Sequence, residues 1–159
     1  MSTTSTASTA STTDRIDKNI VLRAPRSKVW RALTDPAQFS AWFEVKLTDP
    51  FVPGARVRGP VTSKGYEHLT MDITIERVEP ERVFSWRWHP GGDANIDPAE
   101  PTTLVVFELD EVPGGTRLTV TETGFDRIPI SRRDKAYREN TEGWEGQLQN
   151  IRRYLASAT

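Results

Sequence analysis

The sequence contains no cysteine, which excludes disulfide bonds, thiolate catalysis and iron–sulfur clusters held by thiolates. Histidine is almost as scarce. The two histidines, His68 and His89, are too few for a typical histidine-based zinc site. The glycine-rich fingerprint of a dinucleotide-binding loop is also missing. We therefore expect neither a metal ion nor an organic cofactor.

Long apolar runs and an excess of one charge are absent as well. No stretch reaches the length of a membrane span, and the N-terminus lacks the apolar core of a signal peptide. Acidic and basic residues nearly cancel, giving a formal net charge of -1, and there is no basic stripe that would suit a nucleic acid. Together with the missing cysteines, these absences predict a cytoplasmic protein that binds neither nucleic acid nor a membrane.

The apolar residues of the chain suffice for one small hydrophobic core. Its 159 residues fit one domain. Hydrophobic residues make up only 36% of the chain, but five tryptophans and six phenylalanines compensate because each buries a large area. Residues 1–13 are almost entirely Ser, Thr and Ala, which predicts a disordered tail. We therefore expect a single domain over residues 14–159.

The first structured part predicts one strand and two short helices. Residues 16–23 alternate as a strand does and end before Pro25, which suits the first turn of a helix. Residues 29–33 then carry apolar side chains at helical spacing. The Asp-Pro pair at 35–36 is a second helix start, and this helix should reach about Trp42.

The middle of the chain predicts antiparallel strands joined into a meander. Alternating apolar and polar residues place these strands at residues 56–63, 69–78, 83–88, 103–111 and 116–123. Residues 89–101, which are rich in proline and glycine, predict a long loop.

One long amphipathic helix is predicted over residues 131–155. Ser131 resembles the start of a capping box, whereas Arg132 is expected to be a solvated charge. Gly143 and Gly146 weaken such a helix by about 1 kcal/mol each relative to alanine. They either permit close approach of another group or mark a local bend. The apolar stripe of the helix consists of Tyr137, Trp144, Leu148, Ile151 and Leu155.

Motifs in five places accompany this order of elements. They are Ala24-Pro25 with residues 29–36 (VWRALTDP), Trp42-Phe43, Val78-Glu79-Pro80, residues 115–125 (GTRLTVTETGF), and Gly143-Trp144 with Leu148, Tyr154 and Leu155. In these motifs the chain resembles the SRPBCC superfamily, also called START-like or helix-grip. More narrowly, it resembles the branch named after the activator of the 90-kDa heat-shock protein ATPase.

The resemblance covers residues 14–156 and implies an α+β helix-grip fold. Such a fold has a curved antiparallel sheet wrapped around a long C-terminal helix, with two short helices after the first strand. It also implies a cavity between sheet and helix, which relatives use for lipids, hormones, polyketides or other apolar molecules.

Three tryptophans are the first candidates for lining that cavity. Trp86 and Trp88 lie two apart on one strand and so project from the same face, and Trp144 belongs to the helix stripe that should cover this face. They form either an aromatic pocket or simply the core. Phe107 on the next strand and Leu148 on the helix point into the same space.

Four polar residues complete the candidate site. Glu122 follows two apolar residues on one strand face, so it is either a buried carboxylate or a residue at a strand end that reaches solvent. Tyr66 and His68 share a predicted strand face and offer hydrogen bonds if that face points inward. Asn140 lies one helical turn before Trp144, where it contacts a ligand or caps the edge of the sheet.

These candidates support three functions. The leading hypothesis is that the chain binds a small hydrophobic or amphipathic molecule. The second is an enzyme of cyclase, hydratase or hydrolase type that uses Glu122 and His68 as acid and base. The third, suggested by the branch name, is a weak interaction with a chaperone as an activator of a heat-shock ATPase. No nucleophile triad, metal cluster or phosphate loop is visible in the sequence.

Overall fold

The computed structural model describes residues 14–90 and 97–157, so the predicted tail at residues 1–13 lies outside the described residues. A six-stranded antiparallel sheet has the order β1-β6-β5-β4-β3-β2. The elements, in chain order, are β1 (Arg15–Leu22), α2 (Arg26–Thr34), α3 (Pro36–Phe43), β2 (Arg56–Pro60), β3 (Thr70–Glu79), β4 (Val83–Trp88), β5 (Thr103–Val112), β6 (Gly115–Thr123), the 3₁₀ turn η1 (Phe125–Arg127) and α4 (Ile130–Ser157).

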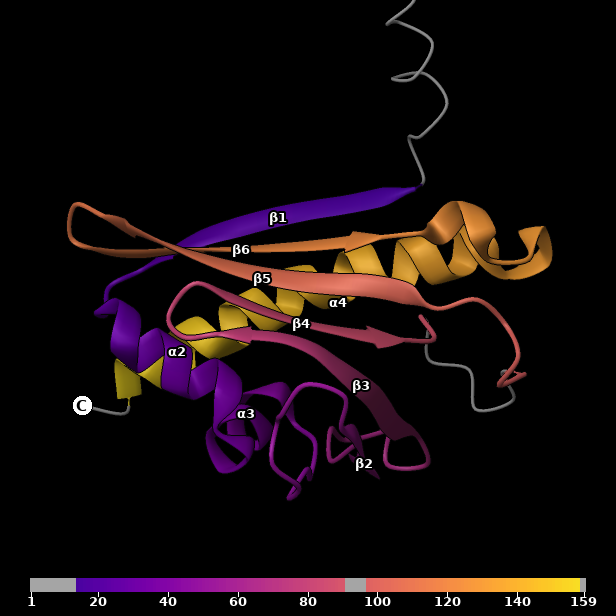
Figure 1. Ribbon diagram of the computed structural model, residues 1–159, viewed down its shortest axis with the longest axis horizontal. Coiled ribbons are helices and arrows are strands. Elements are labelled where there is room, and N and C mark those ends of the chain that lie inside the picture. Colours follow the sequence, from indigo (N-terminus) through magenta and orange to yellow (C-terminus); the bar gives the residue numbers. More distant parts are fainter. Residues whose placement is uncertain (1–13, 91–96, 158–159) are drawn as a thin grey trace, which may run out of the picture.

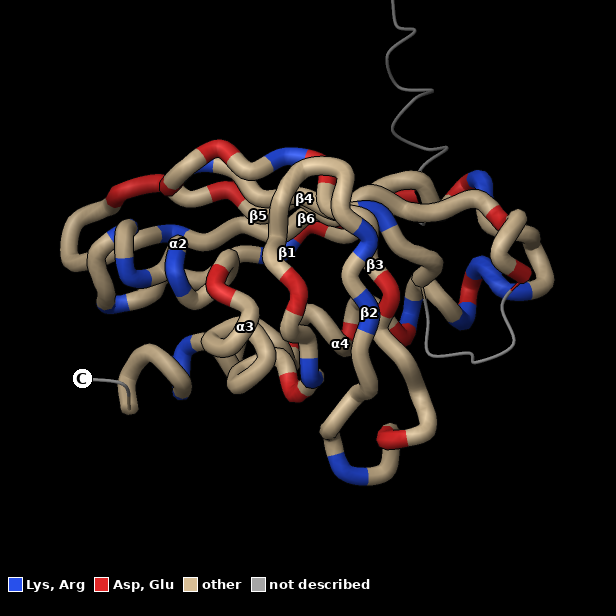
Figure 2. The backbone as a smooth tube through the Cα atoms, turned by 60° about the horizontal axis from the view of Figure 1, so that its bottom comes forward, with Lys and Arg blue, Asp and Glu red and all other residues tan. Residues whose placement is uncertain are grey.

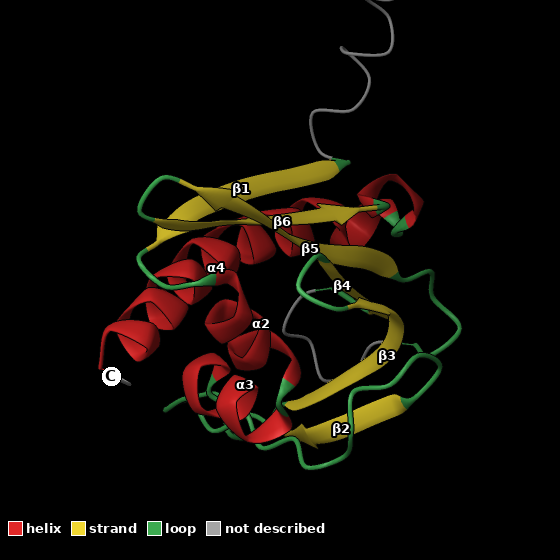
Figure 3. Ribbon diagram, turned by 60° about the vertical axis from the view of Figure 1, so that its left-hand side comes forward, coloured by secondary structure: helices red, strands yellow, loops and turns green. Residues whose placement is uncertain are grey.

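The sheet curves around the terminal helix. Figures 1 and 3 show α4 running along the concave side of the sheet. On the same side α3 lies near β2 and β3, whereas α2 contacts β5, β6 and α4. Strands β2 to β6 form the predicted meander, and β1 returns beside β6 at one edge. The predicted α+β helix-grip fold is therefore confirmed.

A bulge strengthens the curvature of the sheet next to the tryptophans of β4. The register between β3 and β4 shifts between Ile75 and Arg77, and the backbone N–H of Arg77 donates to Oγ of Ser85 over 3.1 Å. An extra residue in one strand bends that strand and increases its twist. The bulge in β3 lies opposite Ser85 and Trp86 of β4.

The start of β3 differs from the prediction. Val61 forms an isolated bridge with Val45, and residues 63–68 form consecutive turns in place of the predicted strand ends. Gly65 has a φ of 93° that other residues rarely adopt. The backbone N–H of Tyr66 donates to the carbonyl of Ser63 over 2.9 Å, and that of Leu69 donates to Tyr66 over 3.0 Å. Tyr66 and His68 therefore lie in a turn, and the expectation that they share a strand face was wrong.

The start of α4 also differs. The helix begins at Ile130, one residue before the predicted cap Ser131, because the carbonyl of Pro129 already accepts from the backbone N–H groups of Arg132 and Arg133. Arg132 is not a solvated charge. Its guanidinium pairs with Glu100 over 2.8 Å and donates to the carbonyl of Pro90 over 3.3 Å, so it ties both ends of the predicted long loop to the helix.

Aromatic rings fill the core beneath α4. Trp86 is fully buried, and its ring centroid lies 5.2 Å from that of Phe107, 5.7 Å from Phe39 and 6.3 Å from Trp144. The indole N–H of Trp86 has no hydrogen-bond partner within the described residues. Trp86 and Phe107 are thus core residues, and so is Leu148 on α4 with 6% of its surface exposed.

Candidate ligand-binding cleft

A cleft of about 710 Å³ opens between α4, the end of α3 and the turn at residues 61–69. Its volume lies within the range of small-molecule sites. Four aromatic rings and two aliphatic side chains line it together with polar and charged groups. The lining residues are Phe43, Glu44, Val61, Ser63, Tyr66, His68, Leu69, Trp88, Lys135, Glu139, Asn140, Glu142, Gly143, Trp144, Gly146, Gln147 and Asn150.

Tryptophans from the sheet and from the helix meet in the wall of this cleft. The ring centroids of Trp88 on β4 and Trp144 on α4 lie 5.9 Å apart at an angle of 33°. Phe43, at the end of α3, packs edge-on against Trp144 at 6.1 Å. Three separate elements therefore contribute one continuous aromatic surface.

Glu122 lies behind this surface and holds it in place. It is fully buried, and its oxygens accept hydrogen bonds from four side chains. Trp88 Nε1 donates to Oε2 over 2.8 Å, and Trp144 Nε1 donates to Oε1 over 2.8 Å. Thr103 Oγ1 donates to Oε2 over 2.5 Å, and Asn140 Nδ2 lies 2.9 and 3.0 Å from the two oxygens. Three of these four donors line the cleft.

The strand pattern explains the position of Glu122. Leu118, Val120 and Glu122 alternate along β6 and are all buried, so the period of two directs the carboxylate inward. Glu122 lies one residue before the end of β6 and pairs with Ile16 on β1 and Val105 on β5, yet it is fully buried. The alternative that it reaches solvent at a strand end was wrong.

One face of α4 supplies the polar wall. Asn140, Gly143, Gln147 and Asn150 are spaced by three, four and three residues and all line the cleft. Gln147 also donates to the carbonyl of Phe43 over 3.1 Å, which ties α4 to α3 beside the cleft. This polar stripe runs next to the apolar one and was not recognised in the sequence, although its helical spacing was present there.

The two glycines of α4 leave room in the cleft. A Cβ atom placed on Gly143 or Gly146 would meet nothing within 4 Å, so no part of the described chain uses the space that they free. Both glycines line the cleft. Both are exposed positions of α4.

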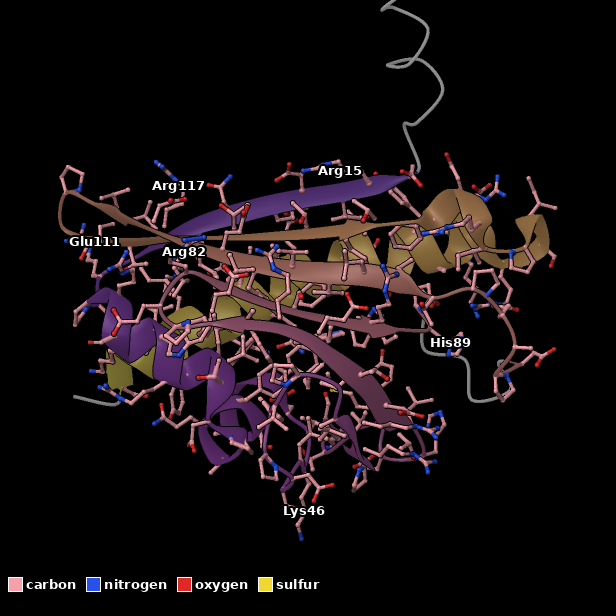
Figure 4. All side chains as sticks on the ribbon, in the orientation of Figure 1. Arg15, Lys46, Arg82, His89, Glu111 and Arg117 are labelled. Atoms are coloured by element: carbon pink, nitrogen blue, oxygen red, sulfur yellow. The ribbon has the colours of Figure 1, made fainter. Side chains whose placement is uncertain are left out.

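The rim carries the remaining candidates. Tyr66 is 58% exposed, and His68 is also exposed. Glu44 ends α3 in a left-handed conformation with a φ of 66°, which is where the chain turns away from the helix. Figure 4 shows His89 at the same end of the sheet as the C-terminus of β4, and its ring contacts the carbonyl of Glu100 at 2.8 Å.

The structure brings some of the predicted residues together and separates others. Trp88, Trp144, Asn140, Tyr66 and His68 line the cleft, whereas Trp86, Phe107, Leu148 and Glu122 lie behind its wall. In the described residues no bond joins the exposed His68 to the buried Glu122. His68 thus lies on the rim of the cleft, whereas Glu122 lies behind its wall.

Three further observations concern the described residues. None of the helices within residues 14–90 and 97–157 is long and apolar enough to cross a membrane. Figure 2 shows acidic and basic positions interspersed along the backbone. Across the same residues, no three His, Asp or Glu side chains gather as they would around a metal ion.

Comparison with protein families gives a direct match. The model of the "Activator of Hsp90 ATPase homolog 1-like protein" family matches residues 23–156. The chain belongs to this family. The match spans α2 to α4 and so includes every residue of the cleft. No curated protein sequence matches the chain.

Solved structures share the fold of this family member. Protein MLL2253 from Mesorhizobium loti is 25% identical, with a TM-score of 0.73 over 91% of this chain and 98% of that one. DynU16, a protein of the dynemicin biosynthetic locus, is 26% identical, with a TM-score of 0.71 over 92% of this chain but only 48% of its own. The Aha1 dimer from Colwellia psychrerythraea, at 19% identity and a TM-score of 0.66 over 87% of this chain and 92% of that one, shares the fold.

Proposed function

We propose that this family member binds a small hydrophobic or amphipathic molecule in the cleft between the sheet and α4. The observation that carries the proposal is the support of the cleft wall by Glu122. Trp88, Trp144 and Asn140 line the cleft and all donate to this one buried carboxylate. Binding sites need side chains that are fixed by a supporting layer of hydrogen bonds.

A purely structural role does not account for this arrangement. Burying a carboxylate costs several kcal/mol unless it is fully hydrogen-bonded, and replacing such a group by apolar residues is often neutral or stabilising. An apolar residue at position 122 would fill the core with less risk. The carboxylate instead fixes the orientation of two indoles and one amide at the edge of an open volume.

The glycines of α4 support the same conclusion. Each weakens the helix by about 1 kcal/mol relative to alanine, yet the space that they free is occupied by nothing within 4 Å. A bound molecule lying against the backbone of α4 explains both facts. The likeness to DynU16, a protein in the dynemicin biosynthetic locus, also supports a small-molecule ligand.

Filling the cleft from α4 tests the proposal. The neutral fluorescent probe N-phenylnaphthylamine should brighten on binding the wild-type chain and quench emission from Trp88 and Trp144. The double variant Gly143→Leu/Gly146→Leu should reduce the affinity at least about tenfold, because its side chains occupy the open volume. Arg138→Leu adds the same side chain at an exposed position of α4 outside the cleft, and it should leave binding unchanged.

Two results would contradict the proposal. One is that the wild-type chain does not bind the probe or any member of a library of apolar fragments. The other is that Gly143→Leu/Gly146→Leu and Arg138→Leu bind the probe as the wild type does, which would place the binding elsewhere.

A further inference from the structure

We infer that the ligand of the cleft carries a positive charge on an apolar body, as an aliphatic amine or a quaternary ammonium does. The inference rests on the proposed function and specifies its ligand class. It is based on three features of the same site: the charges of the lining, the uncompensated carboxylate behind the wall, and the two indoles between them.

Acidic side chains outnumber Lys and Arg among the charged lining residues of the cleft. Three carboxylates, those of Glu44, Glu139 and Glu142, face one ammonium group, that of Lys135. Lys135 lies 3.9 Å from Glu139, so the charges of these two offset each other. Glu44 and Glu142 have no ion pair within the described residues. A cation in the cleft would therefore meet two carboxylates that no protein cation neutralises.

Glu122 adds a buried negative charge directly behind the wall. Its oxygens accept hydrogen bonds from two indole N–H groups and one amide NH₂ group. These nitrogen atoms can donate but cannot accept, so both oxygens of Glu122 act as acceptors, as those of an ionised carboxylate do. Neutral donors stabilise this charge without cancelling it. No Lys or Arg forms an ion pair with Glu122 in the described part of the chain. Buried charges are normally paired, and a bound cation would provide the missing counter-charge across the wall.

The two indoles add to the attraction of the cleft for a cation. Trp88 and Trp144 direct their N–H groups at Glu122 while their rings line the open volume. Cations are attracted to aromatic faces, most strongly to that of tryptophan. Donation of an N–H to a carboxylate leaves more electron density on the ring, which strengthens this attraction. An anionic ligand would meet the opposite field at every one of these groups.

Three probes that share one apolar body separate charge from hydrophobicity. They are naphthylmethylammonium, naphthylmethanol and naphthylacetate, titrated by calorimetry at low and at physiological salt. The indole N–H resonances of Trp88 and Trp144 report the location of binding. We expect the ammonium probe to bind at least about tenfold more tightly than the carboxylate probe at low salt, with the alcohol between them. The difference should shrink as salt screens the exposed charges.

Charge-removing variants test the source of the preference. Glu44→Gln and Glu142→Gln should each weaken binding of the ammonium probe about two- to fivefold, which is typical of an exposed charge pair, and leave the alcohol unchanged. Glu111→Gln is the matched control. Glu111 lies at the other end of β5 from Thr103, the partner of Trp88, about 26 Å away at the usual rise per residue (Figure 4).

The outcomes distinguish this inference from the proposed function. Equal affinities for the three probes, or tightest binding of the carboxylate, would overturn the inference while the cleft remained a ligand site. Failure of all three probes to bind would overturn both. An ammonium preference that Glu111→Gln weakens as much as Glu44→Gln does would also overturn the inference, because the charge effect would then not arise in the cleft.

Discussion

Trp144 of α4 donates its indole N–H to Oε1 of Glu122 on β6 over 2.8 Å. This hydrogen bond joins the terminal helix to the sheet directly behind the cleft. Trp86, whose ring lies 6.3 Å from that of Trp144, is buried to the same degree but makes no hydrogen bond through its N–H in the described residues. Of these two neighbouring buried indoles, one therefore has a hydrogen bond and the other has none within the described residues.

Trp144→Phe and Trp86→Phe should therefore lower the free energy of unfolding by different amounts. Both changes remove the same atoms from the core and cost packing energy. Trp144→Phe also leaves Glu122 without one donor, so it should lower the free energy of unfolding by about 1–3 kcal/mol more than Trp86→Phe does. Urea unfolding of the two variants measures the gap. Equal losses would show that the bond contributes nothing to stability.

Glu122→Gln should lower the stability of the fold, although the two side chains have nearly the same size. In Glu122→Gln an amide NH₂ replaces one oxygen and faces donors on either side, so at least one buried donor loses its acceptor. We expect the free energy of unfolding to fall by about 1–3 kcal/mol. The indole N–H resonances of Trp88 and Trp144 should also shift. Glu108→Gln, at an exposed position of β5, is the control and should change stability by less than about 0.5 kcal/mol.

Gly143→Ala and Gly146→Ala should each stabilise the fold. The added methyl group meets nothing within 4 Å, and alanine favours a helix over glycine by about 1 kcal/mol. Thermal or urea unfolding should therefore show a gain of up to that amount per substitution. Gly59→Ala is the opposite case, because its Cβ would lie 1.9 Å from the carbonyl oxygen of Lys46. A loss of stability in Gly143→Ala would contradict the open space described for the cleft.

Acid should weaken one ion pair on the outer surface of the sheet. Arg56 donates to both oxygens of Asp72 over 3.0 and 2.7 Å, and this bond holds the pKa of Asp72 below its ordinary value near 3.8. A depressed pKa in the folded state stabilises it above the unfolded pKa, and this contribution is lost as the pH falls through the folded value.

Asp72→Asn should therefore lower the free energy of unfolding at pH 7 by about 0.2–1 kcal/mol, which is small because the pair is largely exposed. The difference from the wild type should disappear as the pH falls below the folded pKa. Urea unfolding between pH 7 and pH 2 follows both effects. Asp49→Asn removes an exposed aspartate that has no ion pair within the described residues. It should show neither effect, and an equal loss at pH 7 would contradict the role of the Arg56 bond.

The sequence predicted the fold well because strand alternation and the apolar helix stripe are local signals. It also placed Trp88, Trp144 and Asn140 at the site, since period two and helical spacing fix which face a side chain occupies. The donors to Glu122 were beyond such reasoning, because Thr103 and Trp88 lie 19 and 34 residues away along the chain and meet it only through sheet pairing. The single-domain organisation and the cytoplasmic location stay predictions.

The turn at residues 61–69 was mispredicted for a local reason. Tyr66 and His68 alternate with polar neighbours as strand residues do, but Gly65 adopts a positive φ that reverses the chain. The glycine was the available signal. Its effect is to place Tyr66 and His68 on the rim of the cleft, away from the floor.

The bonds of Glu122 also determine how a molecule can reach the cleft. Its donors belong to β4, β5 and α4. An outward movement of α4 would therefore remove the donors of the helix from the buried carboxylate. We therefore expect a molecule to enter and leave past the exposed Tyr66 and His68, so exchange rates should respond to substitutions in their turn more than to the stability of the helix.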